Sequence, residues 1–241
     1  MLNNEASREA LKKAKRIVIK VGTSTITYAN GKRNFSQIDR LAREISDLQN
    51  QGKEMILVTS GAVAVGVDRM GLPGKPKTIP GKQAAAAVGQ GVLMHTYEKF
   101  FADYGQIVAQ VLITKTEAID RHRYTNTRNT FMELMRQRVI PIVNENDVVA
   151  LDELKIGDND NMSALVAGIV DADLVIILSD VDGCIPLIRK RIRTLLLCPK
   201  LRKLLQRLRQ VPAVSALPAV PAVWRLKFRL PRLRQAAAFI W

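Results

Sequence analysis

Short apolar runs alternate with helical patterns along most of the chain, and this alternation limits the possible folds more than any other feature. Each run has the length of a buried strand, and the segments between the runs place apolar residues at helical spacing. The runs cover residues 16–20, 55–59, 107–114, 139–143 and 174–178. Strands that alternate with helices predict a mostly parallel sheet covered on both faces. We therefore expect an α/β fold, a three-layer αβα sandwich on an open sheet.

The segments between the strands carry signals for where helices begin and end. Ser36 is the predicted N-cap of a helix that Gly52 closes, because serine favours the cap and glycine the left-handed position after the last turn. Longer helices are predicted over residues 83–101 and 121–138, and a further apolar helical run starts at Met162.

Two clusters of Asp, Asn and Glu interrupt this pattern close together. Asn144-Glu-Asn-Asp147 follows an apolar strand, and Gly157-Asp-Asn-Asp-Asn161 precedes the helix that starts at Met162. Open α/β sheets bind ligands at the carboxyl ends of their strands. One such cluster is equally well explained as a turn or a helix cap. Two clusters, one ending a strand and one opening a helix, favour a polar binding site.

Three other strands end in turns that suit a binding site. Lys20 is followed by Gly22, so a phosphate could meet both an ammonium and open backbone, although a solvated lysine is the plainer interpretation. Ser60-Gly61-Ala62 could present backbone N–H groups to a carboxylate, or be an ordinary helix cap. Ser179-Asp180 ends the last strand. Parallel strands place these ends at one edge of the sheet, so Lys20, Ser60, Asp147 and Ser179 are expected to converge.

Several common functional patterns are absent from the sequence. There is no G-x-x-x-x-G-K-[ST] phosphate loop, and Val58 stands where a G-x-S-x-G nucleophile motif has its first glycine. His95 and His122 are isolated and lack metal-ligand spacing, so we expect structural or surface roles for them and no metal site made by the protein. Residues 1–10 are polar and no run of 18 apolar residues is present, so we expect no membrane span and a cytoplasmic protein.

The net charge of +15 comes almost entirely from residues 184–241. That segment holds 14 of the 37 basic residues and none of the 22 acidic ones, which leaves a net charge of +1 on residues 1–183. Both cysteines, Cys184 and Cys198, also lie there. A basic tail usually suggests binding to nucleic acid or to an acidic membrane surface. The abrupt change of composition near Gly183 also permits a second explanation, a shift of the reading frame.

The motifs at the strand ends match those of a known family in order and spacing. On them, residues 16–183 resemble the glutamate 5-kinases, a branch of the amino acid kinase family. The first and last motifs are shared widely in that family, whereas the pair of acidic-amide clusters is much more particular to glutamate 5-kinases. The matching segments are residues 17–24, 58–63, 82–90, 143–147, 156–161 and 178–180.

The resemblance implies ATP-dependent phosphorylation of the γ-carboxylate of L-glutamate, the phosphotransfer that begins proline biosynthesis. A carboxylate with a pKa of about 4.3 is already ionised at neutral pH, so this reaction needs no general base. Intact members of the family are expected to be homo-oligomers, and Mg²⁺ would be bound mainly through the phosphates of ATP. The resemblance implies catalytic roles for Lys20 and Asp160, glutamate binding by Ser60, Asp147 and Asn159, and ATP binding by Lys20, Ser179 and Asp180.

Residues 184–241 depart from the family in a way that a shifted reading frame explains. The family continues after Gly183 with a sequence like L-Y-T-A-D-P, and one choice of codons for it, read one nucleotide late, encodes C-I-P-L-I-R, which is residues 184–189. A glycine-rich family loop like T-G-G-M-A-T-K, treated in the same way, gives P-A-V-W-R-L-K, which is residues 221–227. We therefore expect residues 1–183 to be the N-terminal part of an amino acid kinase domain, truncated at its C-terminal side, and residues 184–241 to be an out-of-frame tail.

An out-of-frame tail would remove the family's glycine-rich nucleotide loop, so little or no kinase activity and some aggregation are expected of this product. Two alternatives stay open. A genuine cationic tail, with its basic run at residues 201–209, could bind nucleic acid or acidic lipid, although its positive charge would also bind DNA incidentally. The chain could also be another member of the amino acid kinase family with a different acceptor, against which the two acidic-amide clusters argue.

Overall fold

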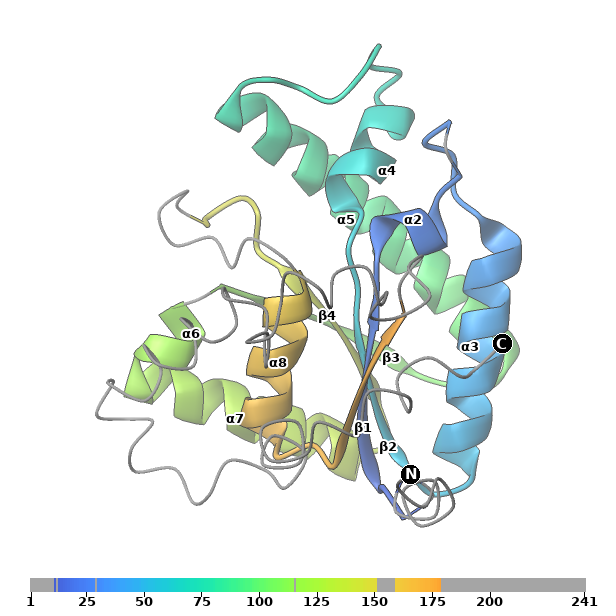
Figure 1. The fold of residues 1–241 in the computed structure, drawn as a ribbon, viewed down its shortest axis with the longest axis vertical. Coiled ribbons are helices and arrows are strands. Elements are labelled where there is room, and N and C mark those ends of the chain that lie inside the picture. Colours follow the sequence, from blue (N-terminus) through green and yellow to red (C-terminus); the bar gives the residue numbers. More distant parts are fainter. Residues whose placement is uncertain (1–10, 12, 29, 115, 151–158, 179–241) are drawn as a thin grey trace, which may run out of the picture.

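The computed structural model describes residues 11, 13–28, 30–114, 116–150 and 159–178. Their strands form one five-stranded sheet in the order β3-β4-β2-β1-β5, and every neighbouring pair is parallel (Figure 1). The parallel α/β sheet expected from the sequence is confirmed. The strands are β1 (Arg16–Val21), β2 (Glu54–Val58), β3 (Val108–Ile113), β4 (Ile140–Glu145) and β5 (Leu174–Leu178).

Helices cover both faces of the sheet, which gives the expected three layers (Figure 1). One face carries α2 (Thr23–Ile26), α3 (Phe35–Asn50) and α5 (Ile79–Asp103). The opposite face carries α6 (Thr116–Ile119), α7 (Arg121–Arg136) and α8 (Asn159–Val170). The short helix α4 (Ala62–Arg69) packs against α5.

Side-chain alternation along the central strands divides the core into two clusters. In β1, Ile17 and Ile19 point to one face and join the buried residues of α3 and α5, while Val18 points to the other face and joins those of α7 and α8. All three are buried. Because parallel strands are covered on both faces, they are apolar at successive positions, and this is why the runs in the sequence were continuous.

Helix α3 begins earlier than the sequence predicted. Asn34, not Ser36, is its N-cap, and the Asn34 side chain accepts a hydrogen bond from the backbone N–H of Gln37 at 3.2 Å. Ser36 lies inside the first turn, so the prediction was wrong by two positions. The predicted end is confirmed, because Gly52 has a φ of +88° just after the helix. Asparagine and serine cap helices about equally well, so their sequence signals could not be told apart here.

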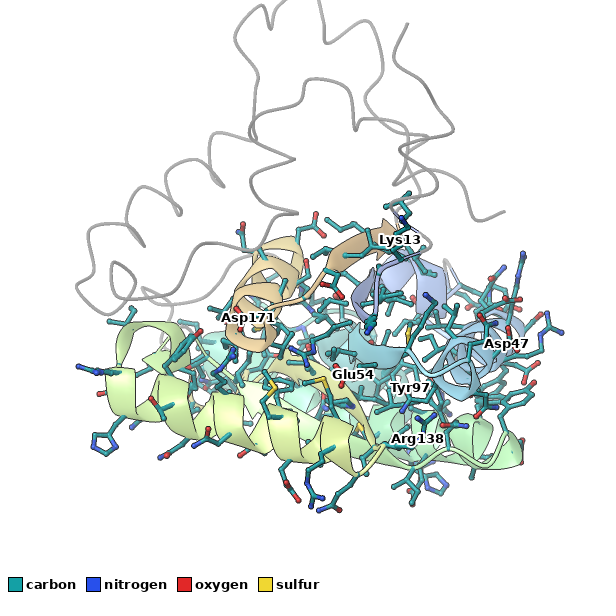
Figure 2. The ribbon with its side chains drawn as sticks, turned by 90° about the horizontal axis from the view of Figure 1, so that it is seen from below. Lys13, Asp47, Glu54, Tyr97, Arg138 and Asp171 are labelled. Carbon is teal, nitrogen blue, oxygen red and sulfur yellow. The ribbon has the colours of Figure 1, made fainter. Side chains whose placement is uncertain are left out.

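Helices α7 and α8 are each followed by a residue in the left-handed conformation. The predicted helix 121–138 ends at Arg136, and Arg138 has a φ of +60°. Gln49 Nε2 of α3 donates to the Arg138 carbonyl at 3.1 Å. After α8, Asp171 has a φ of +50° and its carboxylate lies 2.6 Å from Arg128 Nη2 of α7. Both residues are labelled in Figure 2, and their contacts tie the loops at these helix ends to neighbouring helices.

Helices α4 and α5 approach each other so closely that only glycine fits at two positions. A Cβ atom added to Gly66 would lie 1.8 Å from the Ala85 carbonyl oxygen, and one added to Gly89 would lie 1.8 Å from the Ala62 carbonyl oxygen. Real Cβ atoms essentially never come within 3.0 Å of another heavy atom. The glycines therefore fix the position of α5 beneath the turn that leads from β2 into α4.

Among the residues that the structure describes, no helix has both the length and the apolar character needed to cross a membrane. The predictions for residues 179–180 and for the tail, residues 184–241, fall outside these described residues.

Candidate active site

The carboxyl ends of β1, β2 and β4 meet the N-terminus of α8 at one edge of the sheet. Lys20 of β1 is in register with Val58 of β2 on one side and with Ile177 of β5 on the other. Val58 is in turn paired with Val143 of β4. The residues that follow these strands therefore share one edge, as parallel strands require.

The Lys20 side chain reaches α8. Its ammonium lies 2.8 Å from the carboxylate of Asp160, in the first turn of that helix. The Lys20 side chain is 11% exposed and the Asp160 side chain 46% exposed, so the pair lies at the boundary between core and solvent. A lysine ammonium is held at a nearly buried position only when an anion compensates for its lost hydration, and Asp160 supplies that anion.

Asn159 connects α8 to the turn after β2. Its Nδ2 atom donates to Ser60 Oγ at 2.7 Å and also to the carbonyl oxygen of Thr59. The backbone N–H of Thr59 donates to the carbonyl of Val143 at 2.9 Å, which continues the ladder between β2 and β4 beyond β2. The structure therefore brings together Lys20, Asp160, Asn159 and Ser60, four of the residues singled out in the sequence.

Gly61 lets the chain turn from β2 into α4 beside Ser60. It is the N-cap of α4 and has a φ of +101°, a conformation that favours glycine. A Cβ at Gly61 would also come within 3.1 Å of Ile26 Cδ1 in α2. Any larger residue would be strained here.

The other predicted site residues are placed differently. Asp147 lies in a turn after β4 and is partly buried. Ser179 and Asp180 fall outside the described residues. Strand β5 nevertheless pairs with β1 as far as Leu178 opposite Val21, so its carboxyl end lies beside that of Lys20's strand.

Both histidines lie at the surface. The His95 side chain is 81% exposed and lies 4.0 Å from Glu98, and His122 is exposed on α7. Within the described ranges, no three His, Cys, Asp or Glu side chains gather as a metal site would require.

Three buried polar residues behind this edge were missed as site candidates: Thr59, Gln90 and Tyr97. Asn144 Nδ2 donates to Gln90 Oε1 at 2.8 Å, and the hydroxyls of Thr59 and Tyr97 are 2.7 Å apart. Gln90 and Tyr97 lie two turns apart on α5, on the face toward the sheet (Figure 2 labels Tyr97). Burial raises the pKa of the Tyr97 hydroxyl above its ordinary value. A signal existed for Gln90, a polar residue between two glycines in a helix of small apolar residues.

The chain is similar to known proteins over this same region. The model of the amino acid kinase family matches residues 15–185. The glutamate 5-kinase of Moorella thermoacetica is 58% identical over 176 residues, which are 73% of this chain and 47% of that protein. The glutamate 5-kinases of Clostridium tetani and Clostridium acetobutylicum are each 56% identical, over 66% and 65% of their own lengths.

The matched region of this chain thus spans between about half and two thirds of the length of these curated relatives. The parallel sheet, the convergence of the strand ends at Lys20 and Ser60, and the match over residues 15–185 agree with one another. The chain belongs to the amino acid kinase family.

Proposed function

We propose that the protein is the N-terminal part of a glutamate 5-kinase, which transfers the γ-phosphoryl group of ATP to the γ-carboxylate of L-glutamate. The observation that carries this proposal is the meeting of the Lys20–Asp160 ion pair with the Asn159–Ser60 hydrogen bond at the first turn of α8. A phosphate-binding cation and a polar amino-acid site then lie side by side. The relatives named glutamate 5-kinase support glutamate as the acceptor.

In the proposed reaction, an oxygen of the ionised γ-carboxylate attacks the γ-phosphorus of ATP. The bond from that phosphorus to the β–γ bridging oxygen breaks, which gives glutamyl 5-phosphate and ADP. The protein transfers no proton, so its contribution is to position the two substrates and to stabilise negative charge on the transferred group. Lys20 supplies positive charge there, and Asp160 holds its ammonium at the sheet edge.

Ser60, Asn159 and Asp147 are assigned to glutamate. The Ser60 hydroxyl and the N–H groups near Gly61 suit a carboxylate, and the Asp147 carboxylate suits the α-ammonium. Ser179 and Asp180 are assigned to the nucleotide, together with Lys20. Mg²⁺ would come with ATP and neutralise phosphate charge. The Asp160 carboxylate beside Lys20 fits a site in which the phosphates provide most of the metal's ligands.

We also propose that the family sequence ends near Gly183 and that residues 184–241 are read out of frame. The family match stops at residue 185, close to the change in charge and composition. Through its family the intact enzyme is expected to be a cytoplasmic homo-oligomer. The alternative of a nucleic-acid binder rests on the charge of the tail alone. The match to the kinases does not favour this alternative.

Hydroxamate formation from L-glutamate, ATP and hydroxylamine tests the activity. It should be measured on this chain and on the product of the gene with one nucleotide inserted after codon 183, called here the frame-restored enzyme. We expect activity only in the frame-restored enzyme, and none with aspartate or N-acetylglutamate in place of glutamate. A frame-restored enzyme that is inactive with glutamate would contradict the proposed function, and uninterrupted coding in independent reads of the gene would contradict the frame shift.

A further inference from the structure

Gln90 is a buried amide side chain with an unusual position on α5. It is 8% exposed, and it directly follows Gly89, whose contact with the Ala62 carbonyl fixes this part of the helix. Gln90 Oε1 accepts a hydrogen bond from Asn144 Nδ2, but no acceptor among the described residues lies within hydrogen-bond distance of its Nε2. A buried amide donor without a partner is destabilising, and an apolar residue would avoid that cost.

The Asn144 amide is oriented from both of its ends, by a backbone donor and by Gln90. The N–H of Glu145 donates to Asn144 Oδ1 at 2.9 Å, and since an N–H can only donate, the oxygen of Asn144 must face it. Asn144 Nδ2 then faces Gln90 at 2.8 Å and requires an acceptor there. Gln90 supplies that acceptor and leaves its own NH₂ group turned away.

The orientation of the Asn144 amide in turn affects the hydrogen bonds of Asn159. Asn159 Nδ2 has two hydrogens and three acceptors near it: Ser60 Oγ, the Thr59 carbonyl and Asn144 Oδ1 at 3.3 Å. If the Asn144 amide rotated by half a turn, its NH₂ group would face that of Asn159, donor against donor. Asn159 would then be displaced from Ser60.

We propose that Gln90 is a positioning residue of the amino-acid subsite. It holds the Asn144 amide in the one orientation that lets Asn159 bind Ser60, and so it sets the geometry of two glutamate-binding side chains that it does not touch. This proposal rests on the proposed function for the identity of the ligand, and on the chain of amides from α5 to α8 for the role of Gln90.

The role can be tested without any ligand, by ¹⁵N NMR of the side-chain amides in the full chain. In Gln90→Met, which keeps the length of the side chain and removes the acceptor, the NH₂ signals of Asn144 and Asn159 should shift and their hydrogen exchange should accelerate by about tenfold or more. Glu98→Met, at an exposed position of the same helix, should leave both signals in place. Unchanged Asn144 and Asn159 signals in Gln90→Met would overturn the proposal.

A second variant separates the positioning role of Gln90 from its effect on the stability of the protein. Gln90→Glu keeps an acceptor oxygen for Asn144 Nδ2, so it should retain the Asn144 signals of the parent protein. If Gln90→Met does not fold, this variant decides, and displaced Asn144 signals in a folded Gln90→Glu protein would refute the positioning role.

Calorimetric titration of the frame-restored enzyme with L-glutamate supplies the functional readout. In that background, Gln90→Met should bind L-glutamate about tenfold more weakly than the parent, with Gln90→Glu in between and Glu98→Met unchanged. Equal affinity in Gln90→Met and parent would count against the proposal. If the frame-restored parent itself bound no glutamate, the proposed function would fail at that step, while the NMR comparison would still decide the role of Gln90.

Discussion

The ammonium of Lys20 lies 2.8 Å from the carboxylate of Asp160, and this ion pair joins the end of the central strand β1 to the first turn of α8. The two residues are 140 positions apart in the sequence. Asp160 is well placed for this, because a carboxylate in the first turn also faces the positive end of the helix dipole. The pair therefore serves the fold as well as the proposed chemistry, and the two contributions can be measured separately.

Asp160→Ala should destabilise the protein. The Lys20 ammonium, whose side chain is 11% exposed, would lose its compensating carboxylate, and since the Asp160 side chain is 46% exposed we expect a loss of about 1–2 kcal/mol rather than the larger cost of a fully buried pair. Urea unfolding measures this. The double variant Lys20→Met/Asp160→Ala should be more stable than the sum of the single losses, and simple additivity would show that the two side chains are not coupled.

Lys20→Ala should abolish turnover in the frame-restored enzyme without unfolding it. Removing one charge that stabilises the transferred phosphoryl group is expected to lower kcat by about 10²-fold or more. Circular dichroism would confirm the fold, and Lys13→Ala, at an exposed residue before β1, provides the control. Near-normal kcat in Lys20→Ala would remove Lys20 from the proposed mechanism.

Gly89→Ala should be destabilising, against the usual preference of helices for alanine. The added methyl group would meet the Ala62 carbonyl at 1.8 Å, so the two helices must separate, at a cost of about 1–3 kcal/mol or more. Gly91→Ala is the matched control, because nothing lies within 4 Å of its Cβ position, and it should gain about 0.5–1 kcal/mol from helix propensity. Thermal unfolding of both variants checks the sign of each change, and a stabilised Gly89→Ala would mean that α4 and α5 are not in this contact.

Tyr97→Phe should cost about 1 kcal/mol, because the ring still fills its buried position but the hydroxyl that bonds Thr59 is lost. Thr59 Oγ1 lies 3.2 Å from the Ser60 carbonyl, so the loss acts directly on the turn that carries Ser60. Chemical denaturation measures the change. Tyr104→Phe removes a hydroxyl bonded to Asp39 near the surface and should have a smaller effect, and an equal effect in the two variants would contradict a special role for the buried hydroxyl.

The N-cap of α7 should make the stability of the protein depend on pH in the acid range. The backbone N–H of Arg123 donates to Asp120 at 2.9 Å and lowers the pKa of that carboxyl below its ordinary value of 3.8. A carboxyl whose pKa is lower in the folded state stabilises the fold above its unfolded pKa, and this contribution is lost as the pH falls through the folded pKa. Asp120→Asn keeps a capping oxygen that does not titrate, so its stability should decline less than that of the parent below about pH 4. Parallel stability curves for the two proteins over that range would contradict the assignment.

The sequence was sufficient where a residue's local surroundings decide its structure. Continuous apolar runs such as residues 174–178 predicted strands buried on both faces, and β5 spans those same residues. Gly52 marked a helix end because its left-handed backbone is a local requirement. The N-cap of α3 could not be chosen between Asn34 and Ser36, since both residue types satisfy the same backbone donors.

The amino-acid sequence by itself determined the α/β class, the order of strands and helices along the chain, and the set of polar turns from which the site is built. Only the tertiary structure decided which side chains meet: Lys20 with Asp160, Asn159 with Ser60, and Gln90 with Asn144. The physical reason is that a strand signal is carried by neighbouring residues, whereas a hydrogen bond between side chains 54 or 99 positions apart depends on strand order, register and the close packing of α4 on α5.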